Sequence, residues 1–348
     1  MIDTNFQSSA LVHGGDLAAA RRQFPDAPEP LLDLSTGINP DSYPLPQLPV
    51  DAFTRLPDEA SLRRLNAAAA AAVGAPSGDH VVAAPGTQIL LPLVAQLRPA
   101  GRARVLGPTY AEHLRVATLV GHLAQEVATL DDLAEADLAL VVNPNNPDGR
   151  MVERDALTAI AAAQERRGGL LVVDEAFMDM RPVEASLAGA VDRGGVVVLR
   201  SFGKFYGLAG LRLGFAVAAA PIAARLAAML GPWAVSGPAI AIGTTALMDV
   251  TWANATRRQL NHAASRLDAL LVGAGLDVIG GTALFRLVQT PGAAELFDHL
   301  GRGGIIVRRF TERPTWLRFG LPHGEKAWRR LHGALAMFST MSDQSART

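Results

Sequence analysis

Short β-branched runs alternate with helical stretches between residues 80 and 217 of the sequence. The helical stretches are expected near residues 87–97, 110–121 and 153–167. The β-branched runs are, in chain order, HVVA, ARVL, LALVV, GLLVV, GVVVL and LGFAV. Regular alternation of this kind predicts βα units and a mostly parallel central sheet, because parallel strands need crossover helices. The predicted fold class is therefore α/β.

Polar, turn-forming segments directly follow five of these predicted strands. They are APGTQ, GPTYAEH, NPNNPDG, DEAF and RSFGK. Because the carboxyl ends of parallel strands meet at one edge of an open sheet, α/β proteins bind their ligands there. Polar loops gathered at one edge are more typical of a binding site than of core packing. The sequence thus predicts one ligand site built from several loops.

The composition excludes several classes of function. A chain of 348 residues with 49% hydrophobic content can bury a large core, so one large domain and a smaller one are expected. A net charge of −1 without blocks of like charge argues against nucleic acid and anionic membrane surfaces as partners. The chain has no cysteine, and its eight histidines lack the H-x-x-x-H and H-E-x-x-H spacings, so neither a disulfide nor a metal site is predicted.

Neither a membrane span nor an export signal is predicted. The longest uncharged apolar stretch, residues 213–224, is too short to cross a bilayer and contains a proline. The first residues lack a basic region followed by an apolar run. Together with the absence of cysteine, these features suit a reducing compartment, and a cytoplasmic location is expected.

Lys204 lies among aromatic, glycine and leucine residues, with Arg200 and Arg212 nearby in the sequence. Like charges lower the pKa of an amine, and an unprotonated amine is a nucleophile. The alternative is a surface loop whose lysine points into water. No G-x-G-x-x-G follows a strand and no Walker loop precedes Lys204, so neither nucleotide motif is present. A nucleophilic lysine suits pyridoxal phosphate, whose aldehyde forms a Schiff base with it.

Pyridoxal phosphate makes further demands, which the loops after the strands can meet. Asp174 can keep the pyridine nitrogen protonated, although an aspartate that merely caps a turn would give the same sequence. Tyr110 can cover the cofactor ring, although a half-buried core tyrosine is the alternative. Asn146 can donate to the 3'-oxygen, although it could simply form a turn. The phosphate needs a helix start, hydroxyls and an arginine, which Gly86, Thr87, Ser201 and Arg212 can supply.

The chain resembles the class I/II aminotransferase superfamily, the fold-type I pyridoxal phosphate enzymes, in the segments NPNNPDG, DEAF and SFGKFYGLAGLRLGF. Its most specific feature is S-x-x-K followed eight residues later by arginine. The resemblance implies a large cofactor-binding domain with a mostly parallel central sheet, a smaller C-terminal α+β domain, and a site built across a homodimer. It implies three catalytic residues, the Schiff-base lysine Lys204, the pyridine carboxylate Asp174, and Tyr110. The implied cofactor-binding residues are Gly86, Thr87, Tyr110, Asn146, Asp174, Ser201, Lys204 and Arg212.

Within the superfamily, further segments resemble the threonine-phosphate decarboxylases of cobalamin biosynthesis. These segments are HGGD, LDLSTGINP, PTYAEH, PWAVSGPA, GIIVRRF and TWLRFGLP. The resemblance implies decarboxylation of L-threonine O-3-phosphate, a small phosphorylated amino acid, to (R)-1-aminopropan-2-yl phosphate. It also implies that two arginines hold the substrate carboxylate and that an N-terminal segment folds over the substrate phosphate. The implied substrate-binding residues are His13, Gly14, Gly37, Asn146, Arg308 and Arg318.

Three positions depart from the pattern of related aminotransferases. Phe177 replaces a tyrosine that touches the 3'-oxygen, and Gly203 replaces a hydroxyl residue beside the lysine. Leu56 replaces a tyrosine that reaches the cofactor phosphate of the neighbouring subunit. Two alternatives stay open at this point: an aminotransferase of the histidinol-phosphate type, and a non-catalytic domain of the same fold.

The domain organisation expected from these segments has four parts. They are an N-terminal, substrate-covering arm at 1–45, the large cofactor-binding domain at 46–240, the small domain at 241–340 and a disordered polar tail at 341–348. Within the large domain, a helix is expected from Asp58 to Val73, with Gly74 as its C-terminal stop.

Overall fold

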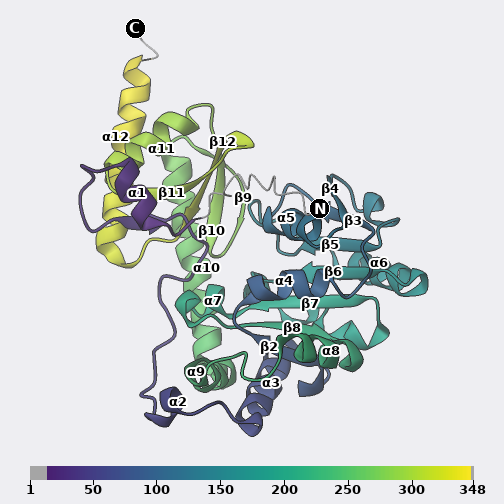
Figure 1. Cartoon of the computed structure of the whole chain (residues 1–348). Helices are drawn as coiled ribbons and strands as arrows, with labels where there is room; N and C mark the ends of the chain where they lie inside the picture. The colour runs from purple at the N-terminus through teal and green to yellow at the C-terminus, as the bar shows by residue number, and fades with distance from the viewer. Residues whose placement is uncertain (1–13, 346–348) are drawn as a thin grey trace, which may run out of the picture.

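The computed structural model describes residues 14–345, with side chains described through residue 340. The chain forms two sheets, which Figure 1 shows in separate parts of the molecule, and helix α10 (Val250–Gly273) runs from one part toward the other. The larger sheet has seven strands in the order β2 (Val81–Ala84), β8 (Gly214–Ala218), β7 (Val196–Ser201), β6 (Leu170–Asp174), β5 (Leu138–Val142), β3 (Arg102–Leu106) and β4 (Leu123–Val127).

The larger sheet is parallel except at one strand. β8 is antiparallel to both of its neighbours, β2 and β7, whereas every other neighbouring pair is parallel. All six strands predicted from the sequence are present, so the predicted α/β class and mostly parallel sheet are confirmed. The sequence analysis missed the edge strand β4, because LAQEV is not a β-branched run and Leu123 is 75% exposed.

Alternate residues along each strand belong to two separate apolar layers, one on each face of the larger sheet. Val172 of β6, for example, packs in one layer and Val173 in the other. Helices α4 (Thr87–Ala95), α5 (Glu112–Leu119) and α8 (Ala220–Leu230) cover the first face, and α3 (Glu59–Val73), α6 (Arg154–Arg167) and α9 (Gly237–Met248) cover the second. Strands buried on both faces require near-continuous apolar runs, which explains why six of them could be found in the sequence.

Helix α3 shows how local sequence sets the limits of an element. The Asp58 side chain accepts a backbone hydrogen bond from the first turn, and Gly74, at φ 74°, ends the helix in the left-handed conformation. The predicted helix is therefore confirmed. Helices α3 and α9 pack closely, because a Cβ added at Gly243 of α9 would lie 3.1 Å from Leu65 of α3.

The five-stranded sheet includes a strand from the N-terminal part of the chain. Its order is β1 (Leu32–Leu34), β11 (Ile305–Phe310), β12 (Arg313–Gly320), β10 (Phe285–Gln289) and β9 (Asp277–Thr282). Because β1 pairs with β11 in parallel, the N-terminal segment is part of the small domain rather than a separate arm. Helices α1 (Leu17–Gln23), α11 (Ala293–Arg302) and α12 (Gly324–Ser345) lie in the same part of the molecule, while α2 (Asp51–Thr54) lies near α9 (Figure 1).

Two boundaries expected from the sequence differ from the structure. The boundary between residues 240 and 241 falls inside α9, which begins at Gly237 because the Ser236 side chain caps it. Since α9 packs against α3, it stays with the larger sheet. The polar tail expected from residue 341 is helical as far as Ser345, because the last helix of the chain continues through it.

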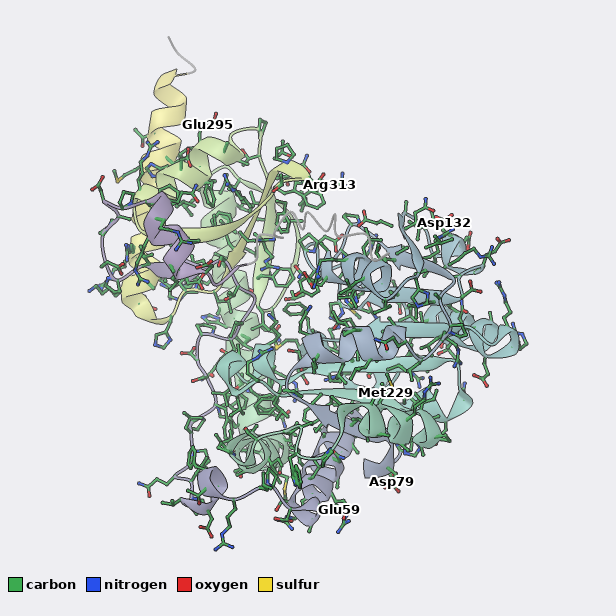
Figure 2. The ribbon with its side chains drawn as sticks, viewed as in Figure 1. Glu59, Asp79, Asp132, Met229, Glu295 and Arg313 are labelled. Atoms are coloured by element: carbon green, nitrogen blue, oxygen red, sulfur yellow. The ribbon has the colours of Figure 1, made fainter. Side chains whose placement is uncertain are left out.

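Charged side chains of both signs lie at the periphery of the molecule. Figure 2 shows Glu59, Asp79 and Asp132 on the side of the large domain, and Glu295 and Arg313 on the side of the small domain. Charges in the interior are therefore exceptions, and each needs a partner or a ligand to offset its desolvation.

The two domains touch backbone to backbone where β9 meets the NPNNPDG loop, residues 143–149. A Cβ added at Gly280 of β9 would lie 2.1 Å from the carbonyl oxygen of Asp148. A Cβ added at Gly149 would lie 1.9 Å from the carbonyl oxygen of Gly281. These glycines therefore set how closely the small domain approaches a loop that ends a strand of the larger sheet.

We expect Gly280→Ala to lower the free energy of unfolding by about 1–3 kcal/mol, because the added methyl group overlaps backbone atoms of the other domain. Gly333→Ala in α12 is the matched control: nothing lies within 4 Å of a Cβ there, and alanine favours a helix by up to about 1 kcal/mol. Urea unfolding of both variants measures the difference. Equal stability of the two variants would contradict the close contact.

Candidate active site

A cavity of about 330 Å³ lies at the edge of the larger sheet where its parallel strands end. The loops after β2, β3, β5, β6 and β7 all contribute to its wall, as the sequence predicts, and the small domain supplies the rest. The residues expected in the site that line this cavity are Gly14, Gly37, Gly86, Thr87, Tyr110, Asn146, Asp174, Ser201, Lys204, Arg212, Arg308 and Arg318. The remaining one, His13, lies outside the described residues.

Lys204 lies on the short helix α7 (Phe202–Phe205), directly after β7. Its Nζ forms no hydrogen bond or ion pair with the described residues and lies 5.8 Å from the centre of the Phe177 ring. Desolvation first, and then the positive charges of Arg318 and Arg212, lower the pKa of Lys204 to about 8, although Asp174 opposes the shift. About a tenth of this amine is therefore unprotonated at pH 7, far more than for a lysine of ordinary pKa, and the unprotonated form is the nucleophile.

Arg200 does not contribute to this shift, contrary to the sequence-based expectation. Successive side chains of a strand point to opposite faces, so Arg200 lies on the other side of the sheet from Ser201. It bonds there to Glu175 at 3.1 Å and to Asp179 at 2.5 Å, in a buried ion-pair network. The neighbouring cation that the sequence analysis did not connect with Lys204 is Arg318 of β12.

Asp174 ends β6 on the face covered by α4, α5 and α8. One of its carboxylate oxygens lies 2.9 Å from Nε2 of the buried His113, and the other accepts from the backbone N–H of Ala176 at 3.0 Å. The turn-capping alternative is thus part of the observed arrangement, yet the same carboxylate also lines the cavity. The contact with His113 holds this carboxylate in place.

The start of α4 forms a cradle for an anion. Gly86, at φ 86°, precedes the helix and provides no side-chain cap, so the first backbone N–H groups of the helix are available to a ligand. Arg212 has a φ of 53°, a strained left-handed conformation that brings its guanidinium against this turn. A Cβ added at Gly86 would lie 2.6 Å from Arg212 Nη2, so only glycine leaves the space between them open. Thr87 and Ser201 line the same end of the cavity.

Arg318 and Arg308 are directly opposite each other on β12 and β11. Arg318 is buried and donates to Asn146 Oδ1 and to the carbonyl oxygen of Ser35, while its Nε has no partner within the described residues. Desolvation, followed by the charge of Arg308, lowers the pKa of Arg318 to about 9. Arg308 forms no hydrogen bond with the described residues and lies 5.5 Å from the Phe310 ring. Its donors are therefore free to bind an anion.

Asn146 links this pair of arginines to the rest of the cavity. Because its Oδ1 accepts from Arg318, its Nδ2 is left as a donor, and this group forms no hydrogen bond within the described residues. An Asn146 in this orientation can donate through Nδ2 to an oxygen of a bound ligand.

The N-terminal segment covers the cavity on the side of the small domain. Gly15 N–H donates to Ser35 Oγ at 2.8 Å, which joins the start of the described chain to the residues after β1. Added Cβ atoms would lie 2.4 Å from the Ser35 carbonyl oxygen at Gly14 and 2.9 Å from the Phe285 ring at Gly37. Both positions therefore require glycine for reasons of space, and the backbone there lies directly over the cavity.

Several lining residues were missed by the sequence analysis. Gln88, Thr109 and Phe310 line the cavity, as do Ser35 and Thr36. Gln88 directly follows Gly86 and Thr87, which are predicted to bind the cofactor phosphate, and Phe310 directly follows the RR pair of GIIVRRF. Both lining residues could therefore have been predicted from their sequence neighbours. Within the described part of the chain, no group of three or more His, Cys, Asp or Glu could hold a metal ion, and no helix is long and apolar enough to span a bilayer.

Comparison with known proteins gives relatives along almost the whole chain. Threonine-phosphate decarboxylase of Sinorhizobium sp is 47% identical over 332 residues, which are 94% of this chain and 98% of that protein. Threonine-phosphate decarboxylase of Pseudomonas aeruginosa is 45% identical over 331 residues, again 94% of this chain and 98% of that protein. Histidinol-phosphate aminotransferase of Symbiobacterium thermophilum is more distant, at 34% identity over 268 residues, 72% of this chain and 73% of that protein.

A solved structure has the same fold. Histidinol-phosphate aminotransferase from Sinorhizobium meliloti, in complex with pyridoxal-5'-phosphate, superposes with a TM-score of 0.79 at 20% identity and covers 97% of this chain and 98% of that one. The family model for aminotransferase class I and II matches residues 52–332. These findings confirm the resemblance inferred from the motifs, and the chain belongs to the class I and II aminotransferase family.

Proposed function

We propose that this chain is a pyridoxal-phosphate-dependent decarboxylase that acts on L-threonine O-3-phosphate. The observation that carries the proposal is the charge of the cavity. Its described lining has four cations, Lys204, Arg212, Arg308 and Arg318, against the single carboxylate of Asp174. Such a cavity is suited to several anionic groups at once, namely a cofactor phosphate together with the carboxylate and phosphate of a substrate.

Pyridoxal phosphate fits the residues that are present. Lys204 has an unpartnered amine of lowered pKa for its aldehyde, and Asp174 has a carboxylate held by His113 for its pyridine nitrogen. The open turn at Gly86 and the N–H groups that start α4 suit its phosphate, together with Arg212. The Nδ2 group of Asn146 can donate to the 3'-oxygen of the cofactor, and the ring of Tyr110 can stack on the face of the cofactor ring.

Different groups in the cavity would serve different steps of the decarboxylation. Bound pyridoxal phosphate supplies an electron sink for the pair released when a bond to the substrate's α-carbon breaks. When that bond is the one to the carboxyl group, CO₂ leaves and the α-carbon must then receive a proton. Lys204, with a pKa of about 8, can hold that proton at Nζ and deliver it. Asp174, held in place by His113, would offer its carboxylate to the ring nitrogen.

Arg308, Arg318 and the N-terminal segment hold the substrate in this proposal. The planar guanidinium groups of Arg308 and Arg318 suit the substrate carboxylate, and Arg318 is fixed by Asn146 on one side. The segment that carries Gly14 and Gly37, with the hydroxyls of Ser35 and Thr36 between them, would cover the phosphate. Which bond breaks depends on how these groups orient the α-carbon, since only a bond perpendicular to the cofactor ring is weakened.

A histidinol-phosphate-type aminotransferase is the alternative, and it would use the same Lys204 and Asp174. Cavity charge does not separate the two activities, because both act on phosphorylated amines. The decarboxylase is favoured because the two relatives that share 45% and 47% identity over 94% of the chain carry that name. A non-catalytic role is not favoured, since Lys204 is intact and its amine lines the cavity without a hydrogen-bond partner among the described residues.

We also propose that the chain forms a homodimer through an apolar surface around α2. Val50, Phe53 and Leu56 are 73%, 68% and 67% exposed, and Trp233, in the segment before α9, is 59% exposed. Gly237 of α9 packs against α2, because a Cβ there would lie 2.2 Å from the Ala52 carbonyl oxygen. Large apolar side chains grouped on a surface are characteristic of a protein–protein interface. Leu56, where relatives have a tyrosine, would then lie in that interface.

The activity is tested with L-threonine O-3-phosphate labelled at the carboxyl carbon. We expect labelled CO₂ to be released by the holoenzyme without any 2-oxo acid, because decarboxylation needs no amino-group acceptor. Lys204→Ala is the matched control and should release at least ~10³-fold less. Absence of CO₂, combined with glutamate formed from histidinol phosphate and 2-oxoglutarate, would assign the chain to the aminotransferases instead.

The lowered pKa of Lys204 predicts how the cofactor-free protein takes up pyridoxal phosphate. The uptake rate should rise with pH and level off above pH 8 to 9, because the amine has a pKa of about 8 and only its unprotonated form attacks the aldehyde. Arg318→Met should shift the rise in uptake rate to higher pH, because it removes a cation that disfavours protonation of Lys204. Stopped-flow absorbance measures both profiles. A rate that keeps rising beyond pH 10, as for an exposed lysine, would contradict this assignment.

The proposed dimer is tested by placing a charge in the apolar surface. Phe53→Asp should shift the chain from dimer to monomer in sedimentation velocity, because a buried unpaired carboxylate at an interface costs several kcal/mol. Met337→Asp on α12 is the control, since Met337 is 63% exposed in another part of the molecule. A monomeric wild-type chain, or dimers in both variants, would exclude this surface as the interface.

A further inference from the structure

A hydrogen-bonded chain lies behind Tyr110, the residue proposed to cover the cofactor ring. The Tyr110 hydroxyl donates to Gln88 Oε1 at 3.2 Å, and Gln88 Nε2 donates to Glu112 Oε2 at 2.7 Å. Glu112 is buried and is paired with Arg115, whose Nη2 lies 2.6 Å from the same carboxylate oxygen. Gln88 itself lines the cavity, on the first turn of α4 beside Thr87.

The chemistry of these groups fixes the direction of every hydrogen bond in the chain. A carboxylate paired with a guanidinium is an acceptor, so Glu112 must receive the Gln88 bond from the amide nitrogen. The amide oxygen of Gln88 then faces Tyr110, and an amide oxygen can only accept. The single phenolic proton of Tyr110 is thereby committed to Gln88. Turning the Gln88 amide over would place two acceptors, Gln88 Oε1 and Glu112 Oε2, against each other.

The position of the Tyr110 ring depends on the same chain. The ring meets His113 edge to face, with centroids 5.9 Å apart, and His113 in turn bonds to Asp174. The hydroxyl oxygen lies on the χ2 axis, so its bond to Gln88 restrains χ1 and the direction of the ring axis, whereas the edge contact with His113 restrains rotation of the ring about χ2. Gln88 and His113 therefore hold Tyr110 at two points, one at the hydroxyl and one at the ring edge.

We propose that Gln88 is a positioning residue for the cofactor: through Glu112 it fixes both the ring of Tyr110 and the direction of its hydroxyl proton. This inference rests on the proposed function, because it concerns the face that Tyr110 presents to pyridoxal phosphate. Tyr110 then contributes a flat surface and no acidic proton to the reaction. Its phenol is further disqualified as an acid by burial and by the charges of Glu112 and Asp174, which raise its pKa to about 12.

A double-mutant cycle on the holoenzyme tests whether Gln88 acts through Tyr110. Gln88→Met keeps the length and volume of the side chain and removes both hydrogen bonds, and Tyr110→Phe removes only the hydroxyl. The readouts are the dissociation constant of pyridoxal phosphate and the visible circular dichroism per bound cofactor, which reports how rigidly the ring is held. We expect each single variant to bind the cofactor about three- to tenfold more weakly, with a reduced dichroism signal.

In the double variant, the proposal requires no further loss: Gln88→Met should change neither readout once the Tyr110 hydroxyl is absent. The matched control is Gln125→Met on the exposed edge strand β4, which should leave both readouts at the wild-type value. Thermal unfolding of the cofactor-free proteins checks that the variants fold. Glu112→Gln, which no longer dictates the orientation of the amide, should reproduce the loss of dichroism.

The outcomes separate this inference from the proposed function. Losses that add in the double variant would mean that Gln88 contacts the cofactor or substrate itself, and would overturn the positioning role. Wild-type values in the Gln88→Met holoenzyme would overturn it as well. A wild-type chain that binds no pyridoxal phosphate would overturn the proposed function together with the inference.

Discussion

The buried guanidinium of Arg318 joins three segments that are far apart in the chain. It extends from β12 of the small domain, donates to Asn146 in the loop after β5, and donates to the carbonyl oxygen of Ser35 after β1. Its charge also acts on Lys204. One side chain thus connects the loop after β5, the segment after β1 and the proposed nucleophile, and it does so across the contact between the two domains.

Without a ligand, this arrangement of charges destabilises the folded chain. A bound anion makes the same arrangement favourable. Desolvation lowers the pKa values of Lys204, Arg308 and Arg318 below their ordinary range, and repulsion by neighbouring cations adds to the shifts of Lys204 and Arg318. Anionic ligands relieve that repulsion and also satisfy donors that have no partner, such as Arg318 Nε. Ligand binding should therefore stabilise the folded chain by mass action, in proportion to its affinity. Protein cores usually avoid buried charges. In this protein the buried charges increase the affinity of the cavity for anionic ligands.

Much of the fold and of the site could be predicted from the sequence, because both depend on strands buried on two faces. Such strands need continuous β-branched runs, and parallel strands bring their following loops to one edge. What could not be predicted depends on distances through space. β4 carries no β-branched run, β1 joins the small domain although it precedes the large one, and α9 crosses an expected boundary. These features follow from packing partners rather than from local sequence.

Lys204 gives the clearest example of that limit. In the sequence, Arg200 is the nearest cation, but the alternation of a β-strand turns it to the opposite face, toward Glu175 and Asp179. The cation that acts most strongly on the amine, Arg318, lies on a strand of the other domain. The family resemblance predicts that Arg318 holds a carboxylate and does not indicate this second effect, because a sequence motif records residue identity and not electrostatic distance.

The acid–base groups of the cavity are too few to choose between reactions. Among the titratable groups of the described lining, Lys204 is the one whose pKa is placed near neutral, while the phenol of Tyr110 is committed to Gln88 and has a pKa of about 12. In the proposed function, proton transfer at the α-carbon would therefore fall to Lys204, whether the bond that breaks leads to hydrogen or to the carboxyl group. The choice between these two bonds would then depend on how Arg308, Arg318 and the segment around Gly37 orient the substrate. Under this proposal the anion-holding groups decide the reaction, and the large domain supplies chemistry that would serve either outcome.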